Sequence, residues 1–213
     1  MYNIDFKNLK CFIFDIDGVL LDHISNNRHE WINNADKDLN IPKDTLEKIH
    51  KNVSEWKNIS LGKSELKDYL DNFVKDENIR RTTSRQIMHY FVKHDTHIRQ
   101  YMLNEIVKIK QKGYKICIGT HQAPEKGSRL WSIEKLNTYF DNYITSYDIG
   151  FLKSEIGFYS SVEKMLNFKS NELILIDDTQ KNIDTAINAG WNAYLYTTFE
   201  DIKSDLFLKL KQL

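Results

Sequence analysis

The sequence predicts an α/β protein: a three-layer fold in which a parallel β-sheet is covered by helices on both faces, with a group of helices inserted after the first strand. Short, wholly apolar segments of strand length alternate with segments whose apolar residues recur at helical spacing. Strands that alternate with helices of this length form parallel sheets buried on both faces. Residues from about 24 to 98 show helical spacing and no strand-like run, so they are expected to form the inserted group.

The first strand is predicted at Cys11–Phe14, where four apolar residues follow one another. The insertion that follows is rich in polar and charged residues, and its apolar residues include the helically spaced Leu46, Ile49 and Val53. The predicted domains are the α/β core, residues 1–22 and 99–213, and the helical insertion, residues 23–98.

After the insertion, strands and helices alternate to the end of the chain, and glycines such as Gly113 and Gly190 mark helix ends. The predicted strands are Lys115–Gly119, Tyr143–Thr145, Leu173–Ile176 and Ala193–Tyr196. The predicted helices carry Met102, Ile106 and Ile109; a segment from about Glu125 to Phe140; Phe158, Val162 and Met165; Ile183, Ala186 and Ile187; and Phe199, Ile202, Leu206 and Leu210.

Length and composition narrow the class of protein. The 213 residues suffice for one α/β domain with a modest insertion, and the 30 basic residues balance 30 acidic ones, so no general attraction to nucleic acid or to an anionic membrane is expected. Cys11 and Cys117 lie in apolar strands and are interpreted as small buried hydrophobes rather than as a disulfide. No apolar stretch has the length of a signal peptide or of a membrane span, which favours a cytoplasmic protein without membrane contact.

Polar residues follow three of the predicted strands directly. They are Asp15 and Asp17, Thr120, and the pair Asp177 and Asp178. Ligands of parallel sheets bind beyond the carboxyl ends of the strands, so these side chains are expected to meet at one rim. Two carboxylates about 4 Å apart repel by about 4 kcal/mol at an effective dielectric of roughly 20. A divalent cation offsets this repulsion, and a ligand set made only of oxygens suits Mg²⁺.

Lys153, in the segment GFLKSEIGFY, would add a positive charge if it reached the same rim. A metal ion, a lysine and a hydroxyl around a carboxylate favour phosphoryl transfer, in which positioning and charge neutralisation supply most of the catalysis. One aspartate can act as the nucleophile, and an acid two residues later can protonate the leaving oxygen. The expected partner is therefore a small phosphate ester.

Four segments in this order resemble the four motifs of the haloacid dehalogenase (HAD) superfamily: DIDGVLLD, IGTHQ, GFLKSEIGFY and LILIDDTQKNIDTAINAG. The resemblance covers about residues 8–22 and 100–200 and implies a Rossmann-like core. The helical insertion resembles the small cap of phosphatases in that superfamily. The nearest likeness is to sugar-phosphatases of the α-glucose-1-phosphate phosphatase type.

The resemblance also implies roles for the acidic residues. Asp15 would be the nucleophile and a Mg²⁺ ligand, and Asp17 would be the general acid and base that gives the metal its backbone carbonyl. Asp178 would bind the metal directly, and Asp177 would contact water on the metal. Gly18 would allow the tight turn between these groups.

Three further residues would bind phosphate by the same resemblance. Thr120 would donate a hydrogen bond to a phosphoryl oxygen, and Lys153 would neutralise charge on the nucleophile and the phosphoryl group. His121 stands where the family often has Asn, and Ser154 stands where it usually has Pro. Ser154 is a candidate cap for the following helix.

Other functions remain open from the sequence. A 2-haloacid dehalogenase of the same superfamily would not need Asp17, because a halide leaves without a proton, and a phosphomutase would use the same phosphorylated aspartate. A non-catalytic binder that keeps the fold is a third alternative. The segment HDTH, His94–His97, is interpreted as solvated surface rather than as a metal site. The sequence specifies neither the substrate nor the oligomeric state.

Overall fold

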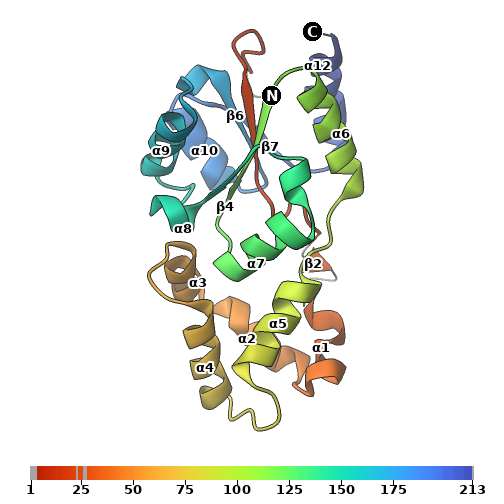
Figure 1. Ribbon diagram of the computed structural model, residues 1–213, viewed down its shortest axis with the longest axis vertical. Coiled ribbons are helices and arrows are strands. Elements are labelled where there is room, and N and C mark those ends of the chain that lie inside the picture. The colour runs from red at the N-terminus through yellow and green to blue at the C-terminus, as the bar shows by residue number, and fades with distance from the viewer. Residues whose placement is uncertain (1–3, 23, 26–27, 213) are drawn as a thin grey trace.

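The structure, a computed structural model, describes residues 4–22, 24–25 and 28–212 (Figure 1). At its centre is a five-stranded sheet with the strand order β5–β4–β1–β6–β7, in which all neighbouring strands are parallel. The strands are β1 (Cys11–Phe14), β4 (Lys115–Thr120), β5 (Asn142–Thr145), β6 (Leu173–Asp177) and β7 (Asn192–Leu195). The predicted fold class, a parallel sheet with helices on both faces, is confirmed.

β1 is the central strand because its residues are apolar on both sides. All four are fully buried, and they alternate between two hydrophobic clusters, with Phe12 and Phe14 on one face of the sheet and Cys11 and Ile13 on the other. The Sγ atoms of Cys11 and Cys117 lie 3.7 Å apart, within hydrogen-bonding distance for sulfur, and form no disulfide. The prediction that both thiols are buried hydrophobes is confirmed.

Helices cover both faces of this sheet (Figure 1). On the face of Cys11 and Ile13 lie α9 (Ile156–Leu166) and α10 (Gln180–Asn188). On the opposite face lie α6 (Gln100–Gln111), α11 (Phe199–Ile202) and α12 (Leu208–Gln212). Two short helices, α7 (Pro124–Ser128) and α8 (Ser146–Ile149), follow β4 and β5 at the carboxyl end of the sheet.

The helical insertion forms the lower half of the molecule in Figure 1 and has a hydrophobic cluster of its own around Trp31 and Phe91. It lies at the carboxyl end of the sheet, and α5 contacts α7 of the core. Its elements are a hairpin of β2 (Ile24–Ser25) and β3 (Arg28–His29), then α1 (Ile32–Leu39), α2 (Lys43–Lys51), α3 (Val53–Ser60), α4 (Leu66–Asp76) and α5 (Ser84–His94).

The chain enters and leaves the insertion through two neighbouring segments. The amide of Asp22 donates to the carbonyl of His97 at 3.1 Å, and the amide of Arg99 donates to the carbonyl of Leu20 at 2.8 Å. The Arg99 guanidinium also donates to the carbonyls of Gly18 and Val19 and pairs with Asp22. These bonds connect the insertion to the loop that follows β1.

Several expectations for individual elements are wrong. The segment from Glu125 to Phe140 is not one helix, because α7 is followed by a π-helical turn at Arg129–Ile133 and a 3₁₀ turn at Leu136–Thr138. Between these turns Lys135 adopts a left-handed conformation, with φ of 60°, which ends the helical run.

The last helix is likewise divided, by a π-helical turn at Lys203–Phe207. The hairpin β2–β3 was not expected in a region that shows no strand-like run. Three residues used to mark buried helix faces are instead exposed: Val53, Met165 and Ile187.

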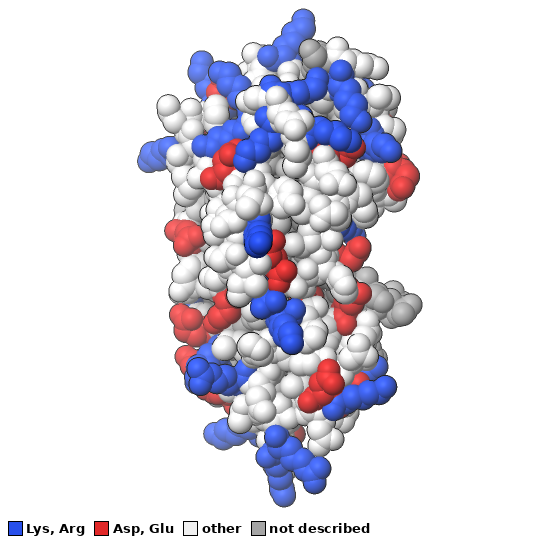
Figure 2. Space-filling model, turned by 45° about the vertical axis from the view of Figure 1, so that its right-hand side comes forward, with Lys and Arg blue, Asp and Glu red and all other residues white. Residues whose placement is uncertain are grey.

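The surface carries both signs of charge. Figure 2 shows acidic and basic side chains mixed around the middle of one face, with lysine and arginine gathered at the end of the core away from the insertion. Among the described residues, no helix is long and apolar enough to cross a membrane.

We expect Gly119→Ala to destabilise the protein, because a Cβ at this position in β4 would lie 2.7 Å from Cγ2 of Ile13. Overpacking of this kind costs about 1–3 kcal/mol. The free energy of unfolding in urea measures the loss. The double variant Gly119→Ala/Ile13→Ala should lose less than the sum of the two single variants, because the contact is then relieved. Strictly additive losses would contradict this explanation.

Candidate active site

The carboxyl ends of three adjacent strands bring together most of the residues singled out in the sequence. Asp15 directly follows β1, Thr120 ends β4, and Asp177 ends β6. All three are buried, with 8%, 1% and 0% of their surface exposed. Because the strands are parallel neighbours, their polar ends share one edge of the sheet.

Lys153 lies between two of these carboxylates. Its Nζ is 2.6 Å from Oδ1 of Asp15 and 2.7 Å from Oδ2 of Asp177, and its side chain is fully buried. Burial alone would lower the pKa of Lys153, but the two carboxylates raise it above its usual value. The lysine is therefore held as an ammonium ion.

The two carboxylates bonded to Lys153 differ in their surroundings. Burial raises the pKa of Asp15 above its usual value, although Lys153 opposes the shift. Burial alone would also raise the pKa of Asp177. The Lys153 charge lowers it below its usual value instead, helped by hydrogen bonds from the Thr179 amide (2.9 Å) and the Asn182 side chain (3.0 Å). Asp177 is thus fixed as a carboxylate, whereas a charged Asp15 requires further positive charge nearby.

Asp178 brings a third carboxylate to the cluster. Oxygen atoms of Asp15, Asp177 and Asp178 lie within 4.8 Å of one another, a separation at which they could hold one metal ion. Asp178 packs against Gly18, whose φ is +78°, and a Cβ on Gly18 would lie 1.9 Å from Oδ2 of Asp178. Glycine is therefore required there by the backbone conformation and by the approach of this carboxylate.

His121 connects several parts of the site. Its Nε2 accepts a hydrogen bond from the backbone amide of Lys153 at 2.6 Å, and its carbonyl accepts one from the Ser60 hydroxyl of α3 at 2.6 Å. Burial, together with the nearby Lys153 charge, lowers the pKa of His121 to about 3. The imidazole is therefore neutral and orients the loop that carries Lys153.

Asp17 points to a partner that the sequence did not reveal. Its Oδ1 lies 2.8 Å from Nζ of Lys126 on α7, and the same ammonium also pairs with Asp95, which ends α5 of the insertion. The interpretation of His94–His97 as solvated surface is wrong for Asp95, which is 5% exposed. Neither Lys126 nor Asp95 lies in an apolar pattern or at a strand end, so the sequence contains no signal for this contact.

The expectation for Ser154 is also wrong. α9 begins after Glu155, which occupies the N-cap position without a side-chain cap.

A pocket of about 210 Å³ lies between the insertion and the core, next to Asp17 and Lys126. Aromatic rings line its insertion side: His50 stacks on His29 with centroids 3.5 Å apart and on Trp56 with centroids 5.3 Å apart. The remaining lining residues are Ser60, Phe91, Asp95, His121, Gln122 and Ala123.

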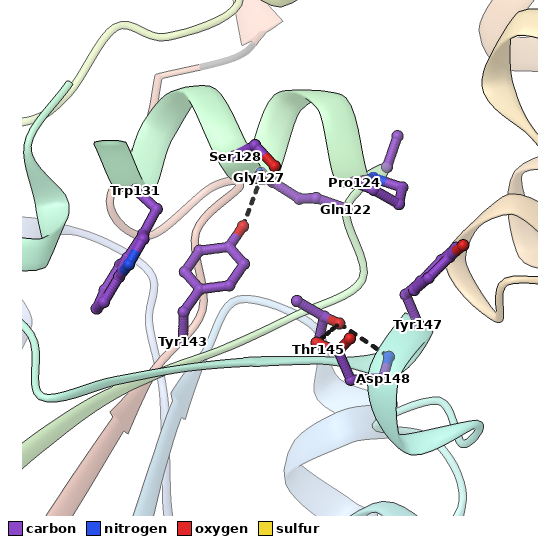
Figure 3. A pocket seen from close by; sticks show the side chains of 10 residues that line it. Gln122, Pro124, Gly127, Ser128, Trp131, Tyr143, Thr145, Tyr147 and Asp148 are labelled. Atoms are coloured by element: carbon purple, nitrogen blue, oxygen red, sulfur yellow. Dashed lines mark hydrogen bonds between the residues drawn. The ribbon is translucent and has the colours of Figure 1, made fainter. Parts of the chain in front are cut away.

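A second pocket, of about 220 Å³, lies beside the first and is shown in Figure 3. Trp131 and Tyr143 from the core form one side of it, and Tyr147 and Asp148 lie on the other. Gln122 lines both pockets and is 5% exposed. Its Nε2 has no hydrogen-bond partner within the described part of the chain.

Comparison with known proteins places the chain in a family. The model of the haloacid dehalogenase-like hydrolases matches residues 9–190. Bifunctional epoxide hydrolase 2 of Mus musculus is 30% identical over 97 residues, which are 44% of this chain but only 18% of that protein. A phosphoglycolate phosphatase of Aliivibrio fischeri is 21% identical over 90% of this chain and 86% of its own length.

The fold is also found in solved structures. A HAD family enzyme from Bacteroides thetaiotaomicron, solved with magnesium and inorganic phosphate, superposes with a TM-score of 0.71 at 17% identity, covering 93% of this chain and 99% of its own. The family model covers most of the chain, including the four segments at the rim. The chain belongs to the haloacid dehalogenase-like hydrolase family.

Proposed function

We propose that the protein is a Mg²⁺-dependent phosphatase that hydrolyses a small phosphomonoester, of the sugar phosphate class, through phosphorylation of Asp15. The observation that carries the proposal is the buried Lys153 ammonium bonded to both Asp15 and Asp177 at the strand ends, with Asp178 within metal-binding reach. A relative that is a phosphoglycolate phosphatase, and a similar fold with bound magnesium and phosphate, support the same reaction class.

The carboxylates at the rim fit a magnesium ion. Three carboxylates lie close together there, two of them paired with the Lys153 ammonium, and their oxygens are the ligand type that Mg²⁺ prefers. Asp15 and Asp178 would hold the ion, with the Asp17 carbonyl. Asp177 already accepts two hydrogen bonds and pairs with the Lys153 ammonium, which favours an indirect role. When bound, the ion would neutralise charge on the nucleophile and on the phosphoryl oxygens.

The reaction would proceed in two displacements. A carboxylate oxygen of Asp15 forms a bond to phosphorus while the bond from phosphorus to the leaving oxygen breaks, and Asp17 gives its proton to that oxygen. In the second displacement Asp17 takes a proton from water, the water oxygen bonds to phosphorus, and Asp15 is released. Thr120 and Lys153 would bind the phosphoryl oxygens, while His121 supports Lys153 through its backbone.

The insertion, residues 23–98, would act as a cap over this site. It contributes one wall of the pocket next to Asp17, and its connections to the core are two adjacent segments of extended chain. A cap in this position excludes water from the phosphorylated aspartate and contacts the leaving group. The two buried free thiols are compatible with a reducing cytoplasm.

The pocket favours a neutral leaving group. The aromatic lining that includes Trp56 suits the apolar face of a sugar ring, and Gln122 and Ser60 offer polar groups to hydroxyls. Asp95 places a buried carboxylate there, and Asp17 adds a second carboxyl group, against the one ammonium of Lys126. This balance disfavours a leaving group with its own carboxylate, such as that of phosphoglycolate.

Two other reactions of the family use the same nucleophile. A haloacid dehalogenase would release chloride from a 2-chloro acid and would not need Asp17, whose side chain is here held by Lys126. A phosphomutase would return the phosphoryl group to substrate. Chloride release, or isomerised sugar phosphate without free phosphate, would identify either one.

We expect Asp15→Asn to abolish phosphate release, with a loss on the order of 10⁴-fold or more, because the nucleophile is removed. The assay measures phosphate released from a panel of phosphometabolites with Mg²⁺. Excess chelator should also abolish the activity, and added Mg²⁺ should restore it. Full activity in either condition would contradict the proposal.

Trp56→Ala should raise KM for a hexose phosphate by about 10-fold with a smaller change in kcat, because an aromatic face contributes about 1 kcal/mol or more to ring binding. Steady-state kinetics with a hexose phosphate and with phosphoglycolate measure the effect. Trp131→Ala, in the second pocket, is the matched control and should leave KM unchanged. A wild-type preference for phosphoglycolate would contradict the assignment of a neutral leaving group.

The neutral His121 should make stability depend on pH. Unfolded histidine has a pKa of about 6.5, so below this pH the unfolded chain binds a proton that the native His121 does not. The contribution of His121 to the free energy of unfolding is therefore fully present above about pH 6.5. As pH falls below this value, the contribution decreases by up to about 1.4 kcal/mol per pH unit. Urea unfolding between pH 4 and 7 should show a shallower slope for His121→Gln than for wild type. The exposed His89 provides the control. If His89→Gln reduces the slope of unfolding free energy against pH as much as His121→Gln does, the explanation is contradicted.

A further inference from the structure

Lys126 makes a deeply buried charged contact at the boundary between the core and the insertion. Its side chain is 4% exposed, and its ammonium is shared between Asp17, at 2.8 Å, and Asp95. The Nζ also lies 5.7 Å from the centre of the Phe91 ring, within the range of a cation–π contact. One ammonium therefore joins the loop after β1, helix α7 and the end of α5.

The charges explain why this contact is specific. Asp95 is almost fully buried, and a buried carboxylate is stable only if it is paired. Pairing with Asp95 alone would satisfy that requirement, yet Lys126 also bonds Asp17, whose side chain is 39% exposed. The bond from Lys126 to Asp17 is thus not needed to bury Asp95. Its effect is to fix the carboxyl group of Asp17.

The position of Asp95 makes this contact depend on the insertion. Asp95 ends α5, the last helix of the insertion, four residues before Arg99 returns the chain to the core. α7 is the core helix that α5 contacts, and Ala123 at its start is part of the hydrophobic cluster of the insertion. Displacement of α5 from α7 would therefore remove Asp95 from Lys126.

The geometry points to Lys126 as a positioning residue that orients Asp17 for proton transfer, with Asp95 making that orientation depend on the insertion lying against the core. The inference rests on the proposed phosphatase reaction, in which Asp17 protonates the leaving oxygen. Lys126 itself transfers no proton and acts only through the Asp17 carboxyl group that does. Its removal should slow only those steps that need the proton of Asp17.

Two substrates of similar shape separate proton transfer from binding. 4-Nitrophenolate is a stable leaving anion, whereas phenolate is more basic and gains more from protonation. The rate of phosphorylation of Asp15 is measured in single turnovers with enzyme in excess, using 4-nitrophenyl phosphate and phenyl phosphate. Asp17→Asn provides the reference, and its loss should be about 10²-fold or more with phenyl phosphate and clearly smaller with the nitrophenyl ester.

Lys126→Met should show the same selectivity, with the phenyl ester slowed about 10-fold more than the nitrophenyl ester. Lys126→Arg should restore most of the phenyl ester rate, because arginine can reach both carboxylates. If Lys126→Met does not fold, the double variant Lys126→Met/Asp95→Asn removes the buried charges together and should show the same selectivity. Asp95→Asn alone should show it more weakly.

Lys110→Met is the matched control, because Lys110 pairs with Asp141 at 2.8 Å on the core away from the rim. It should change neither rate. Equal slowing of both esters by the Lys126 variants would overturn the inference while leaving the phosphatase proposal intact. If Asp95→Asn keeps the wild-type ratio of the phenyl ester rate to the nitrophenyl ester rate, the orientation of Asp17 does not depend on the insertion. Absence of any phosphorylated Asp15 in the wild-type protein would overturn both proposals.

Discussion

The Lys153 ammonium, held between Asp15 and Asp177, is the interaction on which the site depends. Without it, two buried carboxylates would face each other at the ends of adjacent strands, and at least one would be protonated. The ammonium position in turn depends on the loop that carries Lys153. That loop is fixed by its amide bond to His121 and by the Tyr159 hydroxyl, which lies 2.7 Å from the Lys153 carbonyl.

The sheet explains why these groups can be buried at all. β1, β4 and β6 contribute apolar residues to the interior on both faces, and their buried polar residues lie at or just after the carboxyl end of each strand. The cost of desolvating charge is therefore confined to one rim, where backbone amides and one lysine are available. The insertion covers this rim, and its Asp95 pairs with a second buried ammonium, that of Lys126 on the core helix α7.

The sheet and the residues at its rim were predictable because β1, β4 and β6 are short apolar runs, each ending at or just before an aspartate or a threonine. Asp15, Thr120 and Asp177 lie at strand ends as expected, because a buried parallel strand leaves a clear pattern. Lys126 and Asp95 were not predictable. Each lies in a polar segment, and their pairing depends on how the insertion packs on α7, which no local pattern encodes. The breaks after α7 and α11 escaped prediction because each π-helical turn spans only five residues, too few to show an apolar period of its own.

The paired segments at Leu21 and Ile98, where the chain crosses between core and insertion, bear on how such a protein can be altered. Because entry and exit are adjacent, the intervening 75 or so residues behave topologically as one long surface loop, and closing a longer or shorter loop changes its entropy only slowly with length. Exchanging the insertion for one from another hydrolase would keep the strand order and the polar residues at the rim of the sheet. Such a chimera would still need a carboxylate equivalent to Asp95 to pair with Lys126. Substrate selectivity could therefore be redesigned only with insertions that keep this ion pair.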